Sequence, residues 1–242
     1  MKTVFTKASK LVKDSAAVSF DLSGSDRGRG GESTNCDPRC RLLELCYASR
    51  IERIYKGLNS KLAEHAKRGP LWVVNQATLQ LRPKPIRWFR FSVNGSIPDK
   101  YLLGSDWGKF TTALRILISK AQVLGARIHF PVESINKARA YRAALQGLGI
   151  VVRRSVQTGL SAAINAKDHC SVVVSKGPLH SGCVTKEEKR TNTAASYAAA
   201  KRIRAAGRSA VVCPAVAGSS KCGKCTACAD ELVDIVVYPF HG

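Results

Sequence analysis

Acidic residues are scarce in this sequence, and no part of it is apolar for long. Seventeen Asp and Glu face thirty-nine Lys and Arg among 242 residues, so the formal net charge is +22 and the pI is about 10.0. An excess of this size attracts polyanions, of which phosphate backbones are the commonest that a soluble protein meets. A solubilising surface is the alternative, but such surfaces usually mix both signs of charge. We therefore expect nucleic acid, DNA or RNA, as a partner.

Membrane-spanning and secretory segments are also missing. No run approaches about 18 uninterrupted apolar residues. Residues 1–23 alternate Lys with apolar residues and never form the apolar run of about 7–15 residues that a signal peptide needs. We expect a cytoplasmic protein without membrane contact, in a compartment that keeps thiols reduced. The nine cysteines, an odd number, then favour metal binding over disulfides.

The pattern along the chain divides it into two parts. Residues 1–35 are interpreted as a flexible, basic N-terminal arm and linker, Gly- and Ser-rich over 22–35. The first 21 residues of this arm form either a short strand or a loosely attached segment. Residues 36–242 are interpreted as one α/β metal-binding domain, which opens with a helix from about 41 to 67 that Gly69-Pro70 ends.

Strands and helices alternate after this helix. Short β-branched runs predict strands, and apolar stripes at helical spacing predict helices. The predicted strands cover 86–93, 127–132, 150–156, 170–175, 209–216 and 233–240, and the predicted helices cover 111–124, 133–146, 160–167 and 189–206. Because such units connect by right-handed crossovers, we expect an α/β fold with a mostly parallel sheet or a partial (β/α) barrel. Periodicity does not choose between the two.

The C-terminal cysteines have the spacing of a metal site. Two successive two-residue spacers let three thiolates converge on one ion around a tight turn, and a fourth ligand completes a tetrahedron. Zinc or an iron–sulfur cluster suits such sulfur-rich coordination. The alternative is that these cysteines are buried apolar residues. The candidate ligands are Cys222, Cys225 and Cys228, with Cys213 or His241 as the fourth.

A second cluster precedes the first helix. Cys36, Cys40 and Cys46 have no close fourth ligand, which is the pattern of a site with one open metal position. This cluster is therefore the better candidate for chemistry. The alternative is a structural site completed by Cys170 or Cys183.

Three further residues have less specific contexts. Cys170 opens a predicted strand and is expected in the core, whereas Cys183 lies in a polar loop near His180 and has no forced role. His129, inside a predicted strand, is expected to be a core or sheet-end histidine, with a catalytic role as the minor alternative.

Basic residues gather at three places that suit a nucleic-acid partner. In the predicted strand over 86–93, alternation would bury Phe89 with Phe91 and leave Trp88 with Arg90 on the other face. An aromatic ring beside a cation can hold phosphates and stack bases. Arg202 and Arg204 also suit the C-terminal end of the last long helix electrostatically. The candidate contacts are Arg50, Arg53, Lys56, Lys61, Arg87, Trp88, Arg90, Arg202 and Arg204. The sequence contains no helix-turn-helix, Cys2His2 or RNA-recognition pattern.

Several segments resemble a group of cysteine-rich proteins carried by phages and plasmids. The shared features are CDPRCRLLELCYA, RWFRFSVNGSIP, VVRRSV and VVCPAVAGSSKCGKCTACADELVDIVVYPFHG. They span about residues 36–241 and are most specific at the two cysteine segments. Because the biochemical role of that group is poorly defined, the resemblance implies a mobile-element context more than a reaction.

Each cysteine segment also resembles the site of a known enzyme class. The first resembles the cluster loop of radical S-adenosylmethionine enzymes, which implies that Cys36, Cys40 and Cys46 bind three irons of a [4Fe–4S] cluster whose fourth iron binds the cofactor. That superfamily has a partial α/β barrel, and Asn94-Gly95-Ser96 is the candidate for its glycine-rich motif. The C-terminal segment resembles the zinc site of tRNA-guanine transglycosylases, which implies Asp99 and Asp106 as candidate catalytic aspartates.

These patterns predict a metalloprotein of a phage or plasmid that acts on or beside nucleic acid. Its cofactor would be an iron–sulfur cluster or zinc, joined by S-adenosylmethionine if the protein is a radical enzyme. One alternative is a non-enzymatic, zinc-stabilised DNA-binding protein that serves replication or maintenance of the element. Another is a base-exchange transglycosylase. The sequence leaves the substrate, the reaction, the metal and the oligomeric state open.

Overall fold

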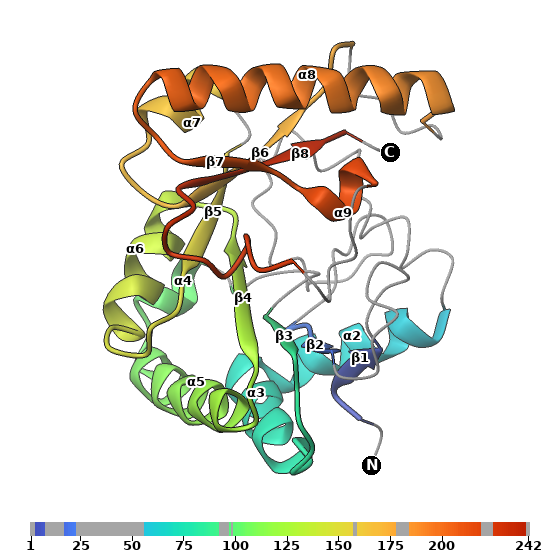
Figure 1. Ribbon diagram of the computed structural model, residues 1–242. Coiled ribbons are helices and arrows are strands. Elements are labelled where there is room, and N and C mark those ends of the chain that lie inside the picture. The colour runs from blue at the N-terminus through green and yellow to red at the C-terminus, as the bar shows by residue number, and fades with distance from the viewer. Residues whose placement is uncertain are drawn as a thin grey trace.

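The computed structural model describes residues 3–7, 17–22, 56–91, 97, 99–156, 159–177, 184–218 and 225–240. Within them, eight strands form one sheet in the order β1-β2-β3-β4-β5-β6-β8-β7 (Figure 1). Only β1 is antiparallel to its neighbour, and the other seven strands are parallel. The prediction of an α/β fold with a mostly parallel sheet is therefore confirmed.

The strands are β1 (Phe5–Lys7), β2 (Ala17–Phe20), β3 (Trp88–Phe91), β4 (Arg127–Val132), β5 (Val152–Val156), β6 (Cys170–Val174), β7 (Ala210–Val212) and β8 (Ile235–Pro239). The helices are α2 (Lys56–Arg68), α3 (Pro70–Gln80), α4 (Asp99–Leu102), α5 (Asp106–Val123), α6 (Ile135–Ala144), α7 (Leu160–Asn165), α8 (Lys186–Ala205) and α9 (Pro214–Ala217). No helix of the described residues is both long and apolar enough to cross a membrane.

The order of the strands decides on which face each connection lies. From β2 to β6 the strands follow chain order, so right-handed crossovers place their helices on one common face. The connection from β7 to β8 runs in the opposite direction, because β8 inserts between β6 and β7. The same handedness then places this connection, which contains α9, on the opposite face. Figure 1 shows α5, α6 and α8 outside a curved sheet and α9 inside it. We call this inner side the concave face.

Aromatic packing forms the core between the sheet and the outer helices. Phe89 and Phe91 are both fully buried, as alternation along the strand predicts. The ring of Phe91 stacks on that of Phe130 in β4, with 4.0 Å between the centroids, and Tyr141 of α6 meets both rings edge-on. Burial of one such ring contributes roughly 2–3 kcal/mol. This layer holds β3 and β4 in place, so their alternate residues face the concave side.

The helix that ends at Gly69-Pro70 is followed directly by another helix, which the sequence interpretation missed. Helix α2 ends at Arg68 as predicted, but Pro70 begins α3. Gly69 has a φ of 85°, a conformation that glycine adopts without strain, and proline is favoured at the first helical position because it needs no N–H partner there. The predicted start of the first helix, near residue 41, lies outside the described residues.

The strand predicted over 209–216 is shorter than expected. Strand β7 ends at Val212, because Pro214 begins the short helix α9 and Cys213 caps it. Other boundaries differ by a few residues, and 127–132 matches β4. At the C-terminal end of α5, Gly125 has a φ of 84° and the N–H of Ala126 bonds back to the carbonyl of Ala121, as expected for a glycine stop.

Part of the predicted N-terminal arm belongs to the sheet. Strand β1 pairs with β2, and β2 lies parallel to β3. Val4 and Leu22, which flank these strands, are each 1% exposed in the main core. The linker over 23–35 and the boundary at residue 36 lie outside the described residues, so the two-part division stays a prediction.

Candidate functional site

The concave face carries a row of polar side chains across the middle strands. Arg90 of β3 lies opposite His129 of β4 in register, and Arg153 follows on β5 opposite Pro131. On β8, Val236 packs on the concave side with Cys213, whereas its two neighbours in the strand pack under α8. The sheet therefore separates an apolar outer layer from a concave face that is rich in nitrogen and sulfur.

The β7–β8 connection brings three of the predicted metal ligands to this face. Cys213 follows the carboxyl end of β7, and Cys225 and Cys228 lie in the loop that returns to β8. All three pack in the same small hydrophobic cluster, around Val216 and Val236. Segments separated by more than ten residues thus meet beside the carboxyl half of β8.

Arg153 holds the returning loop against the sheet. Its side chain is 1% exposed, and its guanidinium donates hydrogen bonds to backbone carbonyls at 3.0–3.3 Å. The acceptors are the carbonyl oxygens of Cys170, Ala227, Cys228, Asp230, Val233 and Asp234. Sequence reasoning missed this residue. The available signal was the pair Arg153-Arg154 inside a β-branched run, because alternation must turn one of the two toward each face.

Several neighbouring groups shift the pKa of the Cys228 thiol. Burial raises the pKa of its thiol above the ordinary value, while the hydrogen bond from Tyr238 and the positive charges of Arg153 and Arg90 oppose this effect. The Tyr238 hydroxyl oxygen is 3.0 Å from the sulfur. A buried thiolate is favourable only with a compensating cation, so these neighbours suit a thiol that binds metal.

The donor set is sulfur-rich and fits zinc or an iron–sulfur cluster chemically. Among the described residues, however, no three His, Cys, Asp or Glu side chains form a group that could hold a metal ion. Cys222 and His241, the remaining predicted ligands of this site, lie outside the described residues. The complete four-ligand site therefore stays a prediction.

The N-terminal cluster cannot be located in the fold. Cys36, Cys40 and Cys46 all lie outside the described residues, as do Cys183 with His180 and the segment 94–96. Cys170, the alternative partner of this cluster, is fully buried on the outer side of β6, with its sulfur 3.8 Å from the carbonyl oxygen of Ala163. The expectation that Cys170 is a core residue is confirmed.

The basic residues of the first predicted strand divide between surface and interior. Arg87 is exposed, whereas Trp88 is only 5% exposed and Arg90 is partly buried. Arg90 Nε donates to His129 Nδ1 over 3.5 Å, the outer limit of a hydrogen bond. Burial, then the charges of Arg90 and Arg153, lower the pKa of His129 to about 3. His129 is therefore a neutral histidine in the middle of the sheet.

Three of the other predicted nucleic-acid contacts lie on helices α2 and α8. Arg202 and Arg204 are exposed in the last turn of α8, and Arg204 also donates to the carbonyl of Ala210 at 2.9 Å. Lys61 of α2 is bound to the protein itself, since its Nζ donates to the carbonyl of Phe5 at 2.5 Å. Burial lowers the pKa of Lys61 to about 8, against the opposing charge of Asp21.

The remaining predicted contacts and the two aspartates are only partly described. Lys56 begins α2, but its side chain is not described, and Arg50 and Arg53 lie outside the described residues. Asp106 begins α5 on the surface, where its carboxylate lies 3.6 Å from the Nζ of Lys109. Asp99 begins α4.

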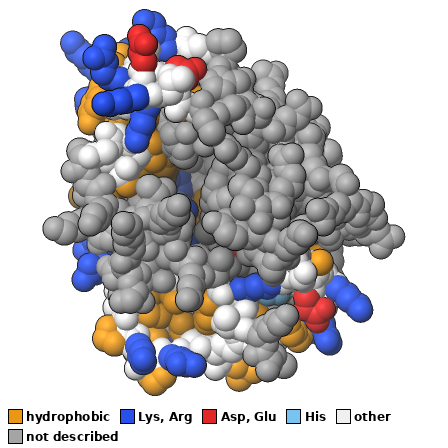
Figure 2. Space-filling view, turned by 90° about the vertical axis from the view of Figure 1, so that its right-hand side faces the viewer, with side chains coloured by type: hydrophobic (Ala, Val, Ile, Leu, Met, Phe, Trp, Pro, Cys, Tyr) orange, Lys and Arg blue, Asp and Glu red, His pale blue; other side chains and the backbone are white. Residues whose placement is uncertain are grey.

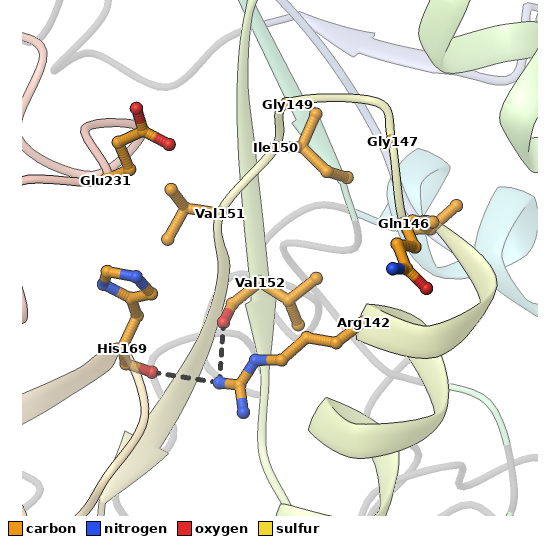
Figure 3. Close-up of a pocket in the computed structure, with 10 residues that line it drawn as sticks. Arg142, Gln146, Gly147, Gly149, Ile150, Val151, Val152, His169 and Glu231 are labelled. Carbon is orange, nitrogen blue, oxygen red and sulfur yellow. Dashed lines mark hydrogen bonds between the residues drawn. The ribbon is translucent and has the colours of Figure 1, made fainter.

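A pocket of about 270 Å³ lies at the opposite, amino edge of the sheet (Figure 3). Arg142 reaches there from α6 and donates to the carbonyls of Val152 and His169 at 3.0 and 3.4 Å. The same nitrogen is 3.0 Å from the carboxylate of Asp168. Ligands of parallel α/β folds bind at the carboxyl ends of strands, and Arg142 already has its partners. This pocket is therefore better explained as part of the scaffold.

A larger cavity of about 520 Å³ lies at the carboxyl ends of β6 and β8. Asn192 of α8 joins the two strand ends there: its side-chain amide donates to the carbonyl of Phe240 and accepts from the N–H of Lys176, both at 3.0 Å. The cavity thus lies at the edge where substrates bind in this class of fold.

The side of the molecule toward which the concave face opens is shown in Figure 2. Lys and Arg side chains stand along the upper and lower margins of this view, with few Asp or Glu among the described atoms. This distribution agrees with the overall charge of +22.

Comparisons with known proteins assign no family to this chain. No family model, no curated protein and no solved structure matches it. Its function is therefore inferred from its own residues.

Proposed function

We propose that this chain is a metalloprotein that acts on or beside nucleic acid and belongs to a phage or plasmid. One observation carries the metal part of the proposal: the reversed β7–β8 connection brings Cys213, Cys225 and Cys228 to the concave face beside the cations Arg90 and Arg153. The sulfur ligands would come from this segment, and Cys222 and His241 are the remaining candidates.

The neighbouring cations support thiolate coordination. Three or four thiolates around a divalent ion leave a net negative charge, which a partly desolvated site must offset. Arg153 and Arg90 lie close enough to favour the charged form of Cys228. Bound there, zinc would hold the loop in place, and an iron–sulfur cluster would also carry electrons.

For the N-terminal cysteines we propose an open iron–sulfur site of the radical S-adenosylmethionine type. The support for an open position is that Cys36, Cys40 and Cys46 have no close fourth ligand in the sequence. The parallel strands β2 to β6, which follow chain order, agree with the partial barrel of that superfamily. The second candidate is a non-enzymatic, zinc-stabilised DNA-binding protein, which the exposed cations Arg202 and Arg204 of α8 favour.

Elemental analysis of protein purified without oxygen, together with its visible spectrum, tests the metal proposal. Brown protein with about four irons and four sulfides per bound cluster supports the iron–sulfur site, and colourless protein with zinc supports the DNA-binding candidate. The double variant Cys225→Ser/Cys228→Ser is expected to lose the metal of the C-terminal site. Cys170→Ala, which removes a thiol on the other face of the sheet, is the matched control and should retain it. Wild-type protein free of metal would overturn the proposal.

Salt dependence tests the nucleic-acid part separately. If phosphate contacts account for the excess of cations, the logarithm of the affinity for an oligonucleotide should fall linearly with the logarithm of the salt concentration. Absence of binding at low salt would contradict this part and leave the metal part intact.

A further inference from the structure

Arg90 is a partly buried cation for which the described residues provide no carboxylate. Other arginines at the sheet that are shielded from solvent have acceptors: Arg154 and Arg142 share Asp168, and Arg208 lies 3.7 Å from a carboxylate oxygen of Asp234. Arg153 has its backbone carbonyls. Within the described part of the chain, the Arg90 side chain makes one hydrogen bond, the long contact with His129, and its charge also favours the ionised form of Cys228.

His129 orients Arg90 but does not neutralise it. Its pKa of about 3 keeps the imidazole uncharged at neutral pH, so its Nδ1 can accept a hydrogen bond from the N–H of Arg90 Nε. A guanidinium has five N–H donors in a fork, and this contact occupies one of them. A charge removed from water in this way is unfavourable unless an anion joins it.

Trp88 supplies a second donor without an acceptor. It lies two residues before Arg90, so both side chains leave β3 on the concave face. The indole Nε1 is buried and has no hydrogen-bond partner within the described residues. A buried N–H of this kind is normally paired, so a donor that lacks a partner in the protein requires an explanation, of which a bound water or ion is one.

We propose that Arg90 and the Trp88 indole N–H bind a phosphate oxyanion of the nucleic acid on the concave face. A guanidinium binds phosphate with two parallel hydrogen bonds, and the indole N–H donates to a further oxygen of the same or the next group. Residues two apart on a strand are separated by about 6.5–7 Å, roughly the spacing of successive phosphates. The proposal rests on the nucleic-acid part of the proposed function and not on its metal.

Binding of a labelled single-stranded oligonucleotide to the full chain, followed by fluorescence anisotropy at low salt, tests this assignment. Arg90→Gln is expected to weaken binding by about 10-fold or more, because it removes a charged, bidentate contact. Trp88→Phe, which keeps an aromatic ring and removes the N–H, should weaken it by about 3- to 10-fold. Arg139→Gln, an exposed residue on α6 with the same change of charge, is the matched control and should weaken it by less than about 2-fold.

Further measurements distinguish a strand from a free nucleotide, and a lost contact from a folding defect. Competition by inorganic phosphate or a mononucleotide at similar concentrations would assign the site to a free nucleotide, whereas competition only by oligonucleotides assigns it to a strand. Arg90→Lys keeps the charge but not the fork, so it should bind with intermediate affinity even if Arg90→Gln folds poorly. Equal losses in the Arg90→Gln and Arg139→Gln variants would overturn the proposal. Wild-type protein that binds no oligonucleotide would instead overturn the nucleic-acid part of the proposed function. Metal content measured on the same samples tests the metal part separately.

Discussion

The Tyr238 hydroxyl oxygen lies 3.0 Å from the Cys228 sulfur, and this contact joins the cysteine loop to the strand inserted between β6 and β7. Burial, then the charges of Cys228 and Cys213, raise the pKa of Tyr238 well above its ordinary value, so the hydroxyl stays protonated at neutral pH. Toward a thiolate, which only accepts, the tyrosine must be the donor. In the proposed metal site, this hydroxyl would orient the Cys228 sulfur.

Loss of this hydroxyl should weaken metal binding without unfolding the protein. Tyr238→Phe is expected to lower the zinc affinity roughly 10- to 100-fold, as loss of a hydrogen bond to a metal ligand commonly does. Competition with a chromophoric chelator measures the change. Tyr197→Phe, which removes a hydroxyl from the exposed face of α8, is the control. Equal affinities of the two variants would show that Tyr238 does not serve the metal.

Replacement of Arg153 should release the returning loop. Arg153→Met removes the donors of several buried carbonyls, and each acceptor left unpaired costs about 1–3 kcal/mol unless water reaches it. We expect the free energy of unfolding to fall by about 3 kcal/mol or more, measured by urea denaturation. Arg139→Met on the surface of α6 should change it by less than about 0.5 kcal/mol. A loss as small as that of the control would mean that the loop does not depend on Arg153.

The carboxylate of Asp168 should support stability down to acid pH. It accepts two hydrogen bonds from Arg154 and one from Arg142, all at 3.0 Å. Burial alone would raise the pKa of Asp168, but these bonds, first that of Arg154 and then that of Arg142, outweigh it and lower the pKa below 3.8. The stabilisation is therefore complete above pH 4–5 and is lost as the pH falls through the lowered pKa.

Asp168→Asn is expected to reduce the free energy of unfolding by about 3 kcal/mol at pH 7, because two arginines lose their anion. The difference from the wild type should shrink as the pH falls below 3.8 and through the lowered pKa of Asp168, because the wild-type carboxyl then takes up a proton and becomes neutral. Urea denaturation at pH 7 and pH 3 measures both values. A difference that stays constant over this range would argue against the ion network.

His129 should produce a separate acid sensitivity at higher pH. The folded pKa of about 3 lies below the ordinary 6.5, with Arg90 and Arg153 as the facing charges. Below pH 6.5 His129 is protonated in the unfolded chain but stays neutral in the folded protein. The free energy of unfolding therefore decreases as the pH is lowered from 6.5 to about 3. The slope from one such group is at most about 1.4 kcal/mol per pH unit.

His129→Gln, which keeps an acceptor for Arg90, should remove this slope and leave the stability at pH 7.5 nearly unchanged. Denaturation curves at pH 7.5, 6 and 5 provide the test, and a variant with the same slope as the wild type would show that His129 titrates normally.

Much of the fold could be predicted because its signals are local. The run over 127–132 became β4 without change, and Phe89 and Phe91 point to the core as alternation requires. The cysteine spacing near the C-terminus likewise brings Cys225 and Cys228 into one loop. The helix that begins at Pro70 was missed because proline both follows helices and starts them.

The sequence by itself determined the charge, the α/β class and the candidate ligands, since composition, periodicity and spacing are properties of neighbouring residues. Only the tertiary structure decided that β8 lies between β6 and β7, because strand pairing depends on contacts between distant segments. Because of that insertion, the β7–β8 connection runs along the sheet in the opposite direction to the others, and the cysteine loop lies on the concave face. There Arg153 donates hydrogen bonds to backbone carbonyls of the loop, and the hydroxyl of Tyr238 contacts the sulfur of Cys228. No local sequence pattern specifies these neighbours.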